Sequence, residues 1–471
     1  MLTLADALEA LTGIRPTRAG QVITEATVDS RQVIPGALFV AMQGEHVDGH
    51  DYVESAFKRG AVLALIQKDL SDLLPVVNLE KDFNLEAVVA MENPFCLLVP
   101  DTVKALQQVA KYWRRKLNVR VIGITGSVGK STTKELIADV LNQRYRTLKN
   151  LGNLNNEIGL PLTLLSLSEG HQRAVLEMGF YVPGEISMLC DLALPQVGVI
   201  TNIGTVHAER AGSLEAIARG KAELVQSLPA DGWAVLNYDD PLVRNMEKET
   251  NARVFFYGLD PKADLWADNI DGLGLEGIRF ELHYGDEILH LRVPMIGRHS
   301  VQTVLRATAV GLVEGLTWQE IIEGLHSNTT QLRLVVMRTQ SGALILDDTY
   351  NASPDSTLAA LTLLAELDGY RLAVLGDMLE LGPYERQGHE MVGARAAEVV
   401  DELVTIGEKA RLIGQAAQQA GLQKKAIFMF DEVQPVAEFL QTRLTSSHVV
   451  LIKGSRGMRM DRIVSALESA V

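Results

Sequence analysis

The sequence predicts an α/β protein of three domains, which we place at residues 1–117, 118–331 and 332–471. The chain has 471 residues, and single hydrophobic cores stop growing at about 250–300 residues. Apolar strand-like runs alternate with helical stretches after residue 118 and again after residue 332, which is typical of parallel sheets. The middle domain is therefore a parallel-sheet domain with an antiparallel excursion, and the third is doubly wound and Rossmann-like.

Composition and charge exclude several classes of protein. The net charge is -15, from 44 basic and 59 acidic residues, which argues against a nucleic-acid or acidic-membrane binder. Two cysteines, Cys96 and Cys190, cannot form a disulfide framework and fit a reducing compartment. The sequence has no apolar run of about 18 residues, so we expect no membrane insertion. Asp6 and Glu9 interrupt the first segment, which therefore does not read as a signal peptide, and we expect a cytoplasmic protein.

In the first domain, Leu4, Leu8 and Leu11 lie near one face of an amphipathic helix. Short strands are expected within residues 37–42 and 61–66, and residues 68–96 read as a loop or small excursion. A helix follows at residues 101–117, where Asp101 can act as the N-cap. The first domain boundary is placed at the end of this helix.

In the second and third domains, apolar runs mark the expected strands. Those of the second domain are RVIGIT (120–125), AVLEMG (174–179) and VGVITNIG (197–204), and a helix is expected over residues 131–143. Around Gly285-Asp286, residues 279–297 alternate and predict an antiparallel hairpin. Those of the third are ALILDD (343–348), RLAVLGD (371–377), ELVTIG (402–407), AIFMF (426–430) and VVLIKG (449–454).

The stretch ITGSVGKSTTKE (124–135) predicts a phosphate-binding loop between a strand and a helix. It lacks the first glycine of G-x-x-x-x-G-K-S/T, because that position is Ile124, but Gly126 supplies a turn two residues later. Backbone N–H groups and a helix N-terminus bind anions, Lys130 adds a positive charge, and the Ser131 hydroxyl can reach Mg²⁺. The residues predicted to bind the nucleotide are Thr125, Gly126, Ser127, Val128, Gly129, Lys130, Ser131 and Thr132. The alternative is a glycine turn that only begins a helix.

The shorter loop T-G-x-x-G-K-S/T resembles that of the Mur ligase family. Further segments resemble the branch of the family that adds D-alanyl-D-alanine: DSRQVIPGALFVAMQGEHVDGHDY (29–52), NLGNLNNEIGLPLTLL (150–165), LDDTYNASPDS (346–356), LGDMLELG (375–382) and LIKGSRGMRM (451–460). The resemblance implies a UDP-sugar-binding domain, a central ATP-binding domain and a carboxy-terminal ligase domain. It implies ATP and Mg²⁺ as cofactors and UDP-N-acetylmuramoyl-tripeptide and D-alanyl-D-alanine as substrates. The two are joined through an acyl phosphate in peptidoglycan precursor synthesis, by an enzyme expected to be a monomer.

The resemblance also assigns roles around the phosphates. The implied catalytic residues are Lys130, Glu177, His207 and Lys221, and the implied magnesium ligands are Ser131, Glu177, His207 and a carbamylated Lys221. Asn153 and Asn156 would lie near the nucleotide, although an Asn-rich run also suits a plain turn. Without the family pattern, the glutamate would read as a cap, the histidine as a buried core residue and the lysine as a solvated one.

In the third domain the family pattern assigns further nucleotide contacts to Arg333, Asp348, Tyr350 and Asn351. Arg333 stands fourteen residues before Asp347, with Leu332 in place of the family's glycine.

His299 belongs to GRHSVQT, where Ser300 and Thr303 replace two asparagines that approach adenine in the family. A hydroxyl lacks the two-sided pattern of an amide, so adenine contact is expected to be weaker or carried by backbone.

The expected substrate contacts are Lys453, Ser455 and Arg456, where a βα loop opens a helix, and Ser30, Arg31, Asp48, Gly49 and His50 in the first domain. Both groups have a plainer alternative, a basic helix start and a polar surface turn.

Four other functions compete with this interpretation. A sibling ligase that adds the third amino acid would carry D-Y-A-H-T-P in place of DDTYNASPDS, and a folylpolyglutamate synthetase would lack the UDP-like first domain. A non-catalytic nucleotide-binding partner would have lost residues such as Lys130 or Lys221, which are present. A generic phosphate-loop motor or switch does not account for the third domain.

Overall fold

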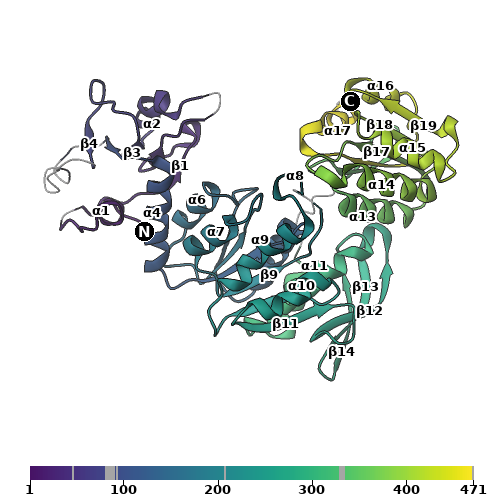
Figure 1. Ribbon diagram of the computed structural model, residues 1–471, viewed down its shortest axis with the longest axis horizontal. Helices are drawn as coiled ribbons and strands as arrows, with labels where there is room; N and C mark the ends of the chain where they lie inside the picture. The colour runs from purple at the N-terminus through teal and green to yellow at the C-terminus, as the bar shows by residue number, and fades with distance from the viewer. Residues whose placement is uncertain are drawn as a thin grey trace. The chain divides into compact units, whose positions relative to one another are not determined.

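The structure is a computed structural model, shown in Figure 1. It describes residues 1–17, 19–44, 47–79, 88, 91, 94–205, 208–327 and 335–468. They form two compact units. The first unit comprises Met1–Gly123, Tyr145–Gly179 and Gly184–Gln196, and the second comprises Ile124–Arg144, Phe180–Pro183 and Val197–Val471.

A parallel five-stranded sheet lies in the first unit, with strand order β1-β2-β3-β5-β4. Its strands are β1 (Ala26–Thr27), β2 (Leu38–Val40), β3 (Leu63–Ile66), β4 (Val76–Asn78) and β5 (Phe95–Leu98). The helices of this part are α1 (Leu4–Thr12), α2 (Val53–Lys58) and α4 (Thr102–Lys116), with 3₁₀ turns η1 (Ser30–Gln32) and η2 (Gly49–Tyr52). The predicted first helix, both short strands and the helix after Asp101 are confirmed.

Asp101 caps α4 as expected, because its Oδ1 accepts hydrogen bonds from the N–H groups of Val103 and Lys104 at 2.9 and 3.0 Å. The expectation of a loop or small excursion over residues 68–96 missed strand β4, which pairs with β5. Strand β4 has only three residues, all half-buried, so it carries neither a long apolar run nor a clear alternation.

The rest of the first unit holds β7 (Thr147–Lys149), β8 (Arg173–Glu177), α6 (Gly159–Leu165) and α7 (Glu185–Ala193). Strands β7 and β8 pair in parallel. Strand β6 (Arg120–Thr125) begins in the first unit and ends in the second. Its bounds match the predicted strand RVIGIT.

The second unit continues with a sheet in the order β14-β13-β12-β11-β10-β9. These strands are β9 (Val197–Ile200), β10 (Trp233–Asn237), β11 (Arg253–Gly258), β12 (Leu265–Gly272), β13 (Ile278–Tyr284) and β14 (Glu287–Val293). Its helices are α5 (Lys130–Leu141), α8 (Ala208–Ala211), α9 (Leu214–Gln226), α10 (Pro241–Arg244), α11 (Val301–Val313) and α12 (Trp318–Leu325), with 3₁₀ turns η3 (Asn245–Glu249), η4 (Gly274–Glu276) and η5 (Arg298–Ser300).

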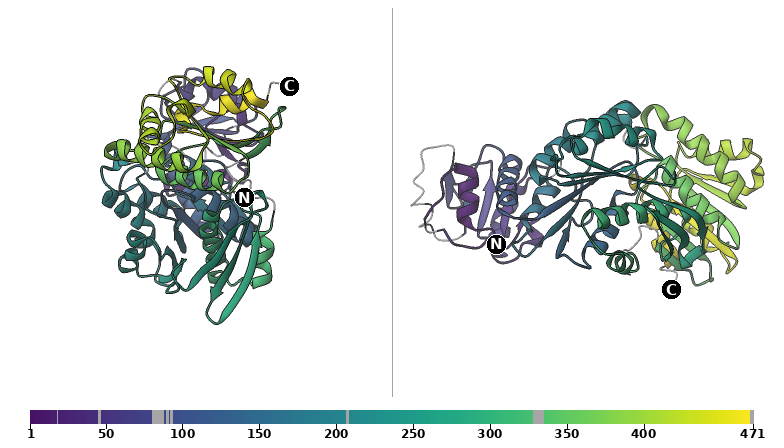
Figure 2. Two further views of the ribbon diagram at one scale, coloured as in Figure 1. Left: turned by 90° about the vertical axis from the view of Figure 1, so that its right-hand side faces the viewer. Right: turned by 90° about the horizontal axis from the view of Figure 1, so that it is seen from below.

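The predicted hairpin is confirmed as β13 and β14. Tyr284 pairs with Glu287, which leaves Gly285 and Asp286 as a two-residue turn, and Gly285 has a φ of 56°. Strand β12 adds to this pair in antiparallel fashion, whereas β9 to β12 pair in parallel. The three antiparallel strands extend together as one long ribbon (Figure 2).

A six-stranded sheet, also in the second unit, has the order β15-β16-β20-β17-β18-β19. Its strands are β15 (Val335–Arg338), β16 (Leu344–Asp348), β17 (Tyr370–Gly376), β18 (Glu402–Ile406), β19 (Ile427–Phe430) and β20 (His448–Lys453). Its helices are α13 (Pro354–Ala365), α14 (Glu385–Val399), α15 (Arg411–Gln419), α16 (Gln434–Gln441) and α17 (Asp461–Glu468), with 3₁₀ turns η6 (Gly382–Tyr384), η7 (Lys424–Ala426) and η8 (Arg456–Met458). All five predicted strands are confirmed, and the antiparallel edge strand β15 is additional.

The alternation of side chains along these strands produces one core on each face of the sheet. Leu346, Leu375 and Leu451 belong to the core covered by α13, α14 and α15. Their neighbours Ile345 and Ile452 belong to the core covered by α16 and α17. Because successive side chains of a strand point to opposite faces, the continuous apolar runs predicted from the sequence give a sheet buried on both sides.

The three sheets span residues 26–98, 120–293 and 335–453, one within each predicted domain. The fold is thus α/β with mostly parallel sheets, and the exact domain boundaries stay predictions. Among the described residues, no helix has both the length and the hydropathy that crossing a bilayer requires.

Candidate functional site

The predicted phosphate loop leaves the carboxyl end of β6 and passes close to residue 201. Gly126 has a φ of 142°, and a Cβ atom built on it would lie 1.8 Å from Thr201 Oγ1. Only glycine fits this position, for both backbone and steric reasons. The glycine that the common pattern places at 124 is therefore not needed, because the tight approach occurs at Gly126.

Asn202, which follows strand β9, holds the loop in place. Its backbone oxygen accepts a hydrogen bond from Ser127 N at 2.9 Å, and its Oδ1 accepts one from Val128 N at 2.8 Å. Ser127 Oγ donates to Gly204 O at 3.1 Å and accepts from Gly204 N at 2.8 Å. Sequence reasoning missed Asn202, whose only signal was its place after a strand.

Helix α5 begins at the end of this loop. Its N-cap, Gly129, has a φ of 82°, and no side chain caps the described helix N-terminus. Lys130 Nζ donates to the Gly126 carbonyl at 2.9 Å, which folds the lysine back over the loop. The arrangement offers an anion the helix N-terminus together with a nearby cation.

A pocket of about 220 Å³ opens beside the loop. It brings together side chains from the loop, from η5 and α11, and from the carboxyl ends of β16 and β20. Its predicted nucleotide or substrate residues are Ser127, Val128, Gly129, Lys130, Ser131, Thr132, His299, Asp348, Tyr350, Asn351 and Lys453. Its apolar wall is formed by Ile296, Ala352, Ala359, Ala360 and Leu363.

Asp348 and Lys453 are neighbours at the end of two parallel strands. They are register partners on β16 and β20, and Lys453 Nζ lies 2.6 Å from Asp348 Oδ2. The lysine also donates to Asn351 O at 2.8 Å and is buried. This edge lies where the strand order reverses, the usual ligand position in doubly wound sheets.

His299, Ser300 and Thr303 line the pocket from η5 and α11. Taken over all its atoms, His299 is exposed to solvent. Desolvation within the pocket nevertheless lowers the pKa of His299, against the raising effect of the Asp348 carboxylate. A lowered pKa keeps the imidazole neutral near pH 7.

Ser455 and Arg456 do not line the pocket. The Ser455 hydroxyl is buried and accepts a hydrogen bond from Leu379 N at 2.8 Å. Arg456 is exposed, with its Cζ 5.8 Å from the centroid of the Tyr350 ring. The α-helix expected at this point is a 3₁₀ turn, η8, and helix α17 begins only at Asp461. Substrate contact by these two residues stays a prediction.

Lys221 is buried in helix α9, contrary to the ordinary behaviour of a helical lysine. It is 1 % exposed, and its Nζ lies 4.6 Å from the centroid of the Phe180 ring. Burial, followed by the charge of Lys130, lowers the pKa of Lys221 well below its usual value. The preceding Gly220 is required here, because a Cβ atom there would lie 2.0 Å from Phe180 Cε2.

In the first unit, Glu177 ends strand β8 and is 3 % exposed. Asn155 Nδ2 donates to Glu177 Oε1 at 2.9 Å, and Asn150 Oδ1 accepts from Glu177 N at 2.9 Å. Asn156 Oδ1 accepts from Gly159 N at 2.9 Å at the start of α6, and Asn153 is exposed. The asparagine run thus fixes the glutamate and begins a helix, and Asn150 is a further residue that sequence reasoning missed.

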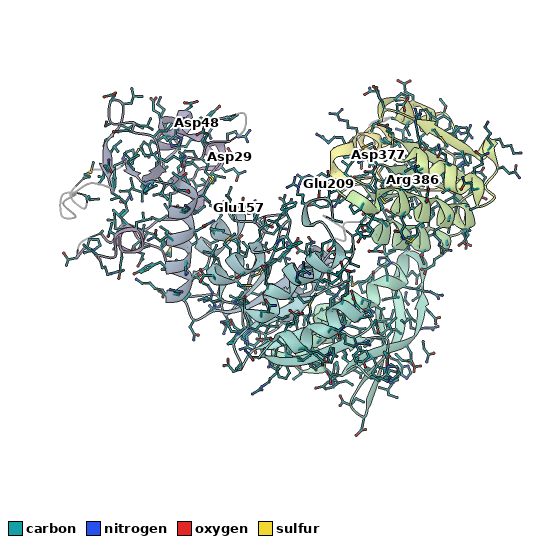
Figure 3. All side chains as sticks on the ribbon, in the orientation of Figure 1. Asp29, Asp48, Glu157, Glu209, Asp377 and Arg386 are labelled. Carbon is teal, nitrogen blue, oxygen red and sulfur yellow. The ribbon has the colours of Figure 1, made fainter. Side chains whose placement is uncertain are left out.

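The predicted UDP contacts lie around η1 and η2 of the first unit, where Figure 3 labels Asp29 and Asp48. His50 is buried, and its Nε2 accepts a hydrogen bond from Gln67 N at 3.0 Å. Its Nδ1 therefore carries the proton that it donates to Asp48 Oδ1 at 2.6 Å. Lys68 also pairs with Asp48, and these bonds hold the pKa of Asp48 well below its ordinary value, the lysine most strongly.

Arg31 is exposed and paired with Asp29 at 2.8 Å, next to the buried Ser30. Gly49 is confined because a Cβ atom there would lie 2.7 Å from Met42 N. The side chains of Arg31, Asp48 and His50 thus make bonds inside this region, and their contact with substrate stays a prediction. Two other predicted site residues, His207 and Arg333, lie outside the described residues.

Comparison with known proteins gives family matches along the chain. "Mur ligase family, catalytic domain" matches residues 22–114, "Mur ligase middle domain" residues 124–311, and "Mur ligase, glutamate ligase domain" residues 332–456. The chain is 35 % identical to the UDP-N-acetylmuramoyl-tripeptide–D-alanyl-D-alanine ligase of Bacillus subtilis, over 95 % of this chain and 93 % of that protein. It is 33 % identical to the Escherichia coli protein of the same name, over 94 % and 93 %.

Solved structures agree with these matches. The crystal structure of MurF from Acinetobacter baumannii has a TM-score of 0.82 at 30 % identity, covering 98 % of both chains. MurF ligase from Thermotoga maritima in complex with ADP has a TM-score of 0.78 at 27 % identity, also covering 98 % of both. With relatives more than 30 % identical along almost its whole length, the chain belongs to the Mur ligase family.

Proposed function

We propose that the chain is an ATP-dependent ligase that joins D-alanyl-D-alanine to UDP-N-acetylmuramoyl-tripeptide, with release of ADP and phosphate. The observation that carries this proposal is the pocket in which the phosphate loop, with Lys130, meets the Asp348–Lys453 pair. The names of the relatives that match the chain over most of its length support the choice of substrates. The MurF structure solved with ADP supports the nucleotide.

The reaction must activate a carboxylate, because its oxygen is a poor leaving group. A carboxylate oxygen of the tripeptide attacks the γ-phosphorus of ATP, the bond to the β-phosphate oxygen breaks, and ADP leaves. The amine of D-alanyl-D-alanine then attacks the acyl carbon. The bond between that carbon and the phosphate-bearing oxygen breaks, phosphate leaves with the bonding pair, and the amine loses a proton. The protein contributes mainly positioning and charge neutralisation, which the loop N–H groups and Lys130 can supply.

Magnesium would neutralise phosphate charge during this transfer. Ser131 offers a hydroxyl oxygen and Glu177 a carboxylate, which are the donor types that Mg²⁺ prefers. A positively charged ammonium group at Lys221 would repel a magnesium ion. Burial, however, lowers the pKa of this lysine and favours the neutral amine. We propose that Nζ of Lys221 attacks the carbon of CO₂ and loses a proton, which gives a carbamate whose oxygens can bind the metal. His207 stays a proposed ligand on the family pattern alone.

The substrates can be tested by mass spectrometry of the product. Purified protein with ATP, Mg²⁺, UDP-N-acetylmuramoyl-tripeptide and D-alanyl-D-alanine should yield the UDP-pentapeptide. Formation of a UDP-tripeptide from the dipeptide-linked nucleotide and a free amino acid would instead identify the sibling ligase. We further propose that the enzyme is cytoplasmic and that it acts as a monomer. Size-exclusion chromatography with light scattering can check the oligomeric state.

A further inference from the structure

Arg306 is a buried arginine next to Gly129 of the phosphate loop. It lies on helix α11 and is 5 % exposed. A Cβ atom built on Gly129 would lie 3.6 Å from Arg306 Nη2, 3.7 Å from Nη1 and 4.0 Å from Cζ. Because both terminal nitrogens are nearer than Cζ, the guanidinium presents its Nη1–Nη2 edge to Gly129.

Two bonds and one ring fix the orientation of this guanidinium. Nε donates to Gln302 O at 3.0 Å, and Nη2 donates to Thr303 Oγ1 at 3.0 Å. Cζ lies 5.8 Å from the centroid of the buried Tyr257 ring, within the range of a cation–π contact. Arg306 itself does not line the pocket, but Thr303 does.

The bond from Arg306 determines what the Thr303 hydroxyl can do. A guanidinium has only donors, so Thr303 Oγ1 must accept in this bond. The hydroxyl hydrogen of Thr303 is then available to an acceptor in the pocket.

The Ser300 hydroxyl, by contrast, can only accept a hydrogen bond from a ligand in the pocket. Its Oγ donates to Ile296 O at 2.7 Å, which occupies its one hydrogen and leaves lone pairs. Ser300 and Thr303 are three residues apart, so they lie on the same side of the helical turn. The pocket therefore presents an acceptor and a donor side by side, next to the apolar wall formed by Ile296, Ala359, Ala360 and Leu363.

We propose that Arg306 is a positioning residue that fixes Thr303 as a donor, so that Thr303 and the acceptor Ser300 together select the adenine ring of ATP. Adenine presents an N6 amino donor beside a ring-nitrogen acceptor, which is the complement of this pair. Hypoxanthine carries an oxygen acceptor in place of the amino group, which would face the lone pairs of Ser300. This inference rests on the proposed function, because it requires ATP to bind in this pocket.

The test compares the affinities of the full chain for ATP and ITP by isothermal titration calorimetry, without acceptor substrates. Wild type should bind ATP roughly tenfold more tightly than ITP. This ratio of affinities is what the loss of one hydrogen bond to a mismatched base would produce. Arg306→Met removes every N–H donor of the side chain but keeps its unbranched apolar stem, and it should reduce this ratio severalfold. Arg306→Lys keeps an N–H donor that reaches nearly as far as Nη2, and it should retain most of the ratio. Ser300→Ala should reduce the ratio as Arg306→Met does.

Two further variants separate positioning from packing. In a Thr303→Val background, Arg306→Met should change the ATP/ITP ratio no further, because the arginine acts through the threonine. Thr308→Val is the matched control, since the buried Thr308 hydroxyl of the same helix has no hydrogen-bond partner among the described residues. It should leave the ratio unchanged.

Each contrary result has a distinct meaning. If Arg306→Met weakens ATP and ITP equally, the arginine acts by charge on the phosphates and the proposal is wrong. The same holds if a folded Arg306→Met protein, checked by circular dichroism, keeps the wild-type ratio. If wild type binds neither nucleotide, the proposed function itself fails, and this inference fails with it.

Discussion

At the scale of single residues, the site depends on side chains whose ordinary behaviour is overridden by their surroundings. Lys130 folds back to the Gly126 carbonyl at 2.9 Å, and Lys221 is buried against Phe180. The sequence could predict Lys130, because the Gly-Lys-Ser turn between a strand and a helix is a local pattern. It could not predict Asn202 or Arg306, because Asn202 contacts the loop across more than seventy residues and Arg306 lies against the distant Gly129 and Tyr257.

Lys130→Ala should lower kcat/KM for ATP-dependent phosphate release by about 10²–10³, the usual cost of removing one positioned charge or donor from such a site. The reason is that the pocket would lose the lysine cation that folds back over the loop. Steady-state phosphate release measures this effect, with the exposed Lys262→Ala as a control. A Lys130→Ala enzyme with wild-type kcat/KM would show that this lysine of the loop does not stabilise the transferred phosphate.

Carbamylation of Lys221 predicts a response to CO₂. Activity of wild type should fall in CO₂-stripped buffer and return when bicarbonate is added, because the neutral amine of this low-pKa lysine is the form that reacts. Lys221→Ala should be at least about tenfold less active and should not respond to bicarbonate. Equal responses of wild type and variant would rule out the modification at this position.

At the scale of elements, prediction succeeded where a segment's own pattern determines its structure. The hairpin of β13 and β14 and the strands of the third sheet are marked by alternation, apolar runs and turn residues. The short strands β4 and β15 were missed because they have three or four residues, half-buried or exposed, and depend on pairing with a neighbour. The start of α17 was missed because a 3₁₀ turn precedes it.

Helix α12 offers a prediction about stability and pH. Thr317 and Glu320 form its capping box, and Arg144 pairs with Glu320 at 2.5 Å. These bonds, that of Arg144 first, lower the pKa of Glu320 to about 2 from 4.5. Since the folded pKa is the lower one, this stabilisation is present above pH 4.5 and is lost as pH falls toward the folded pKa.

Glu320→Gln should therefore reduce the free energy of unfolding near pH 6, and the difference from wild type should shrink as pH approaches 2. Urea unfolding at several pH values measures this difference. Glu323→Gln, on the same helix but bonded only to Gln319 among the described residues, is the matched control for removing a carboxylate from this helix. A Glu320→Gln difference that does not change with pH would contradict the assigned pKa.

At the scale of the whole molecule, the order of motifs along the chain was the strongest predictor of the family. Segments from residues 29–52 to 451–460 resembled one branch in the same order, and the family matches cover residues 22–114, 124–311 and 332–456. The pocket brings residues near 127, 300, 350 and 453 together, which local sequence patterns alone do not predict. Such a site is created by the topology of the sheets, whose carboxyl edges collect residues that are distant in sequence.

The proposed ligase activity can be tested by measuring phosphate release from ATP and Mg²⁺, with UDP-N-acetylmuramoyl-tripeptide and D-alanyl-D-alanine each omitted in turn. We expect stoichiometric release of phosphate and formation of UDP-pentapeptide only when both substrates are present. Sustained phosphate release without either substrate, or ATP binding with no release under any condition, would contradict it.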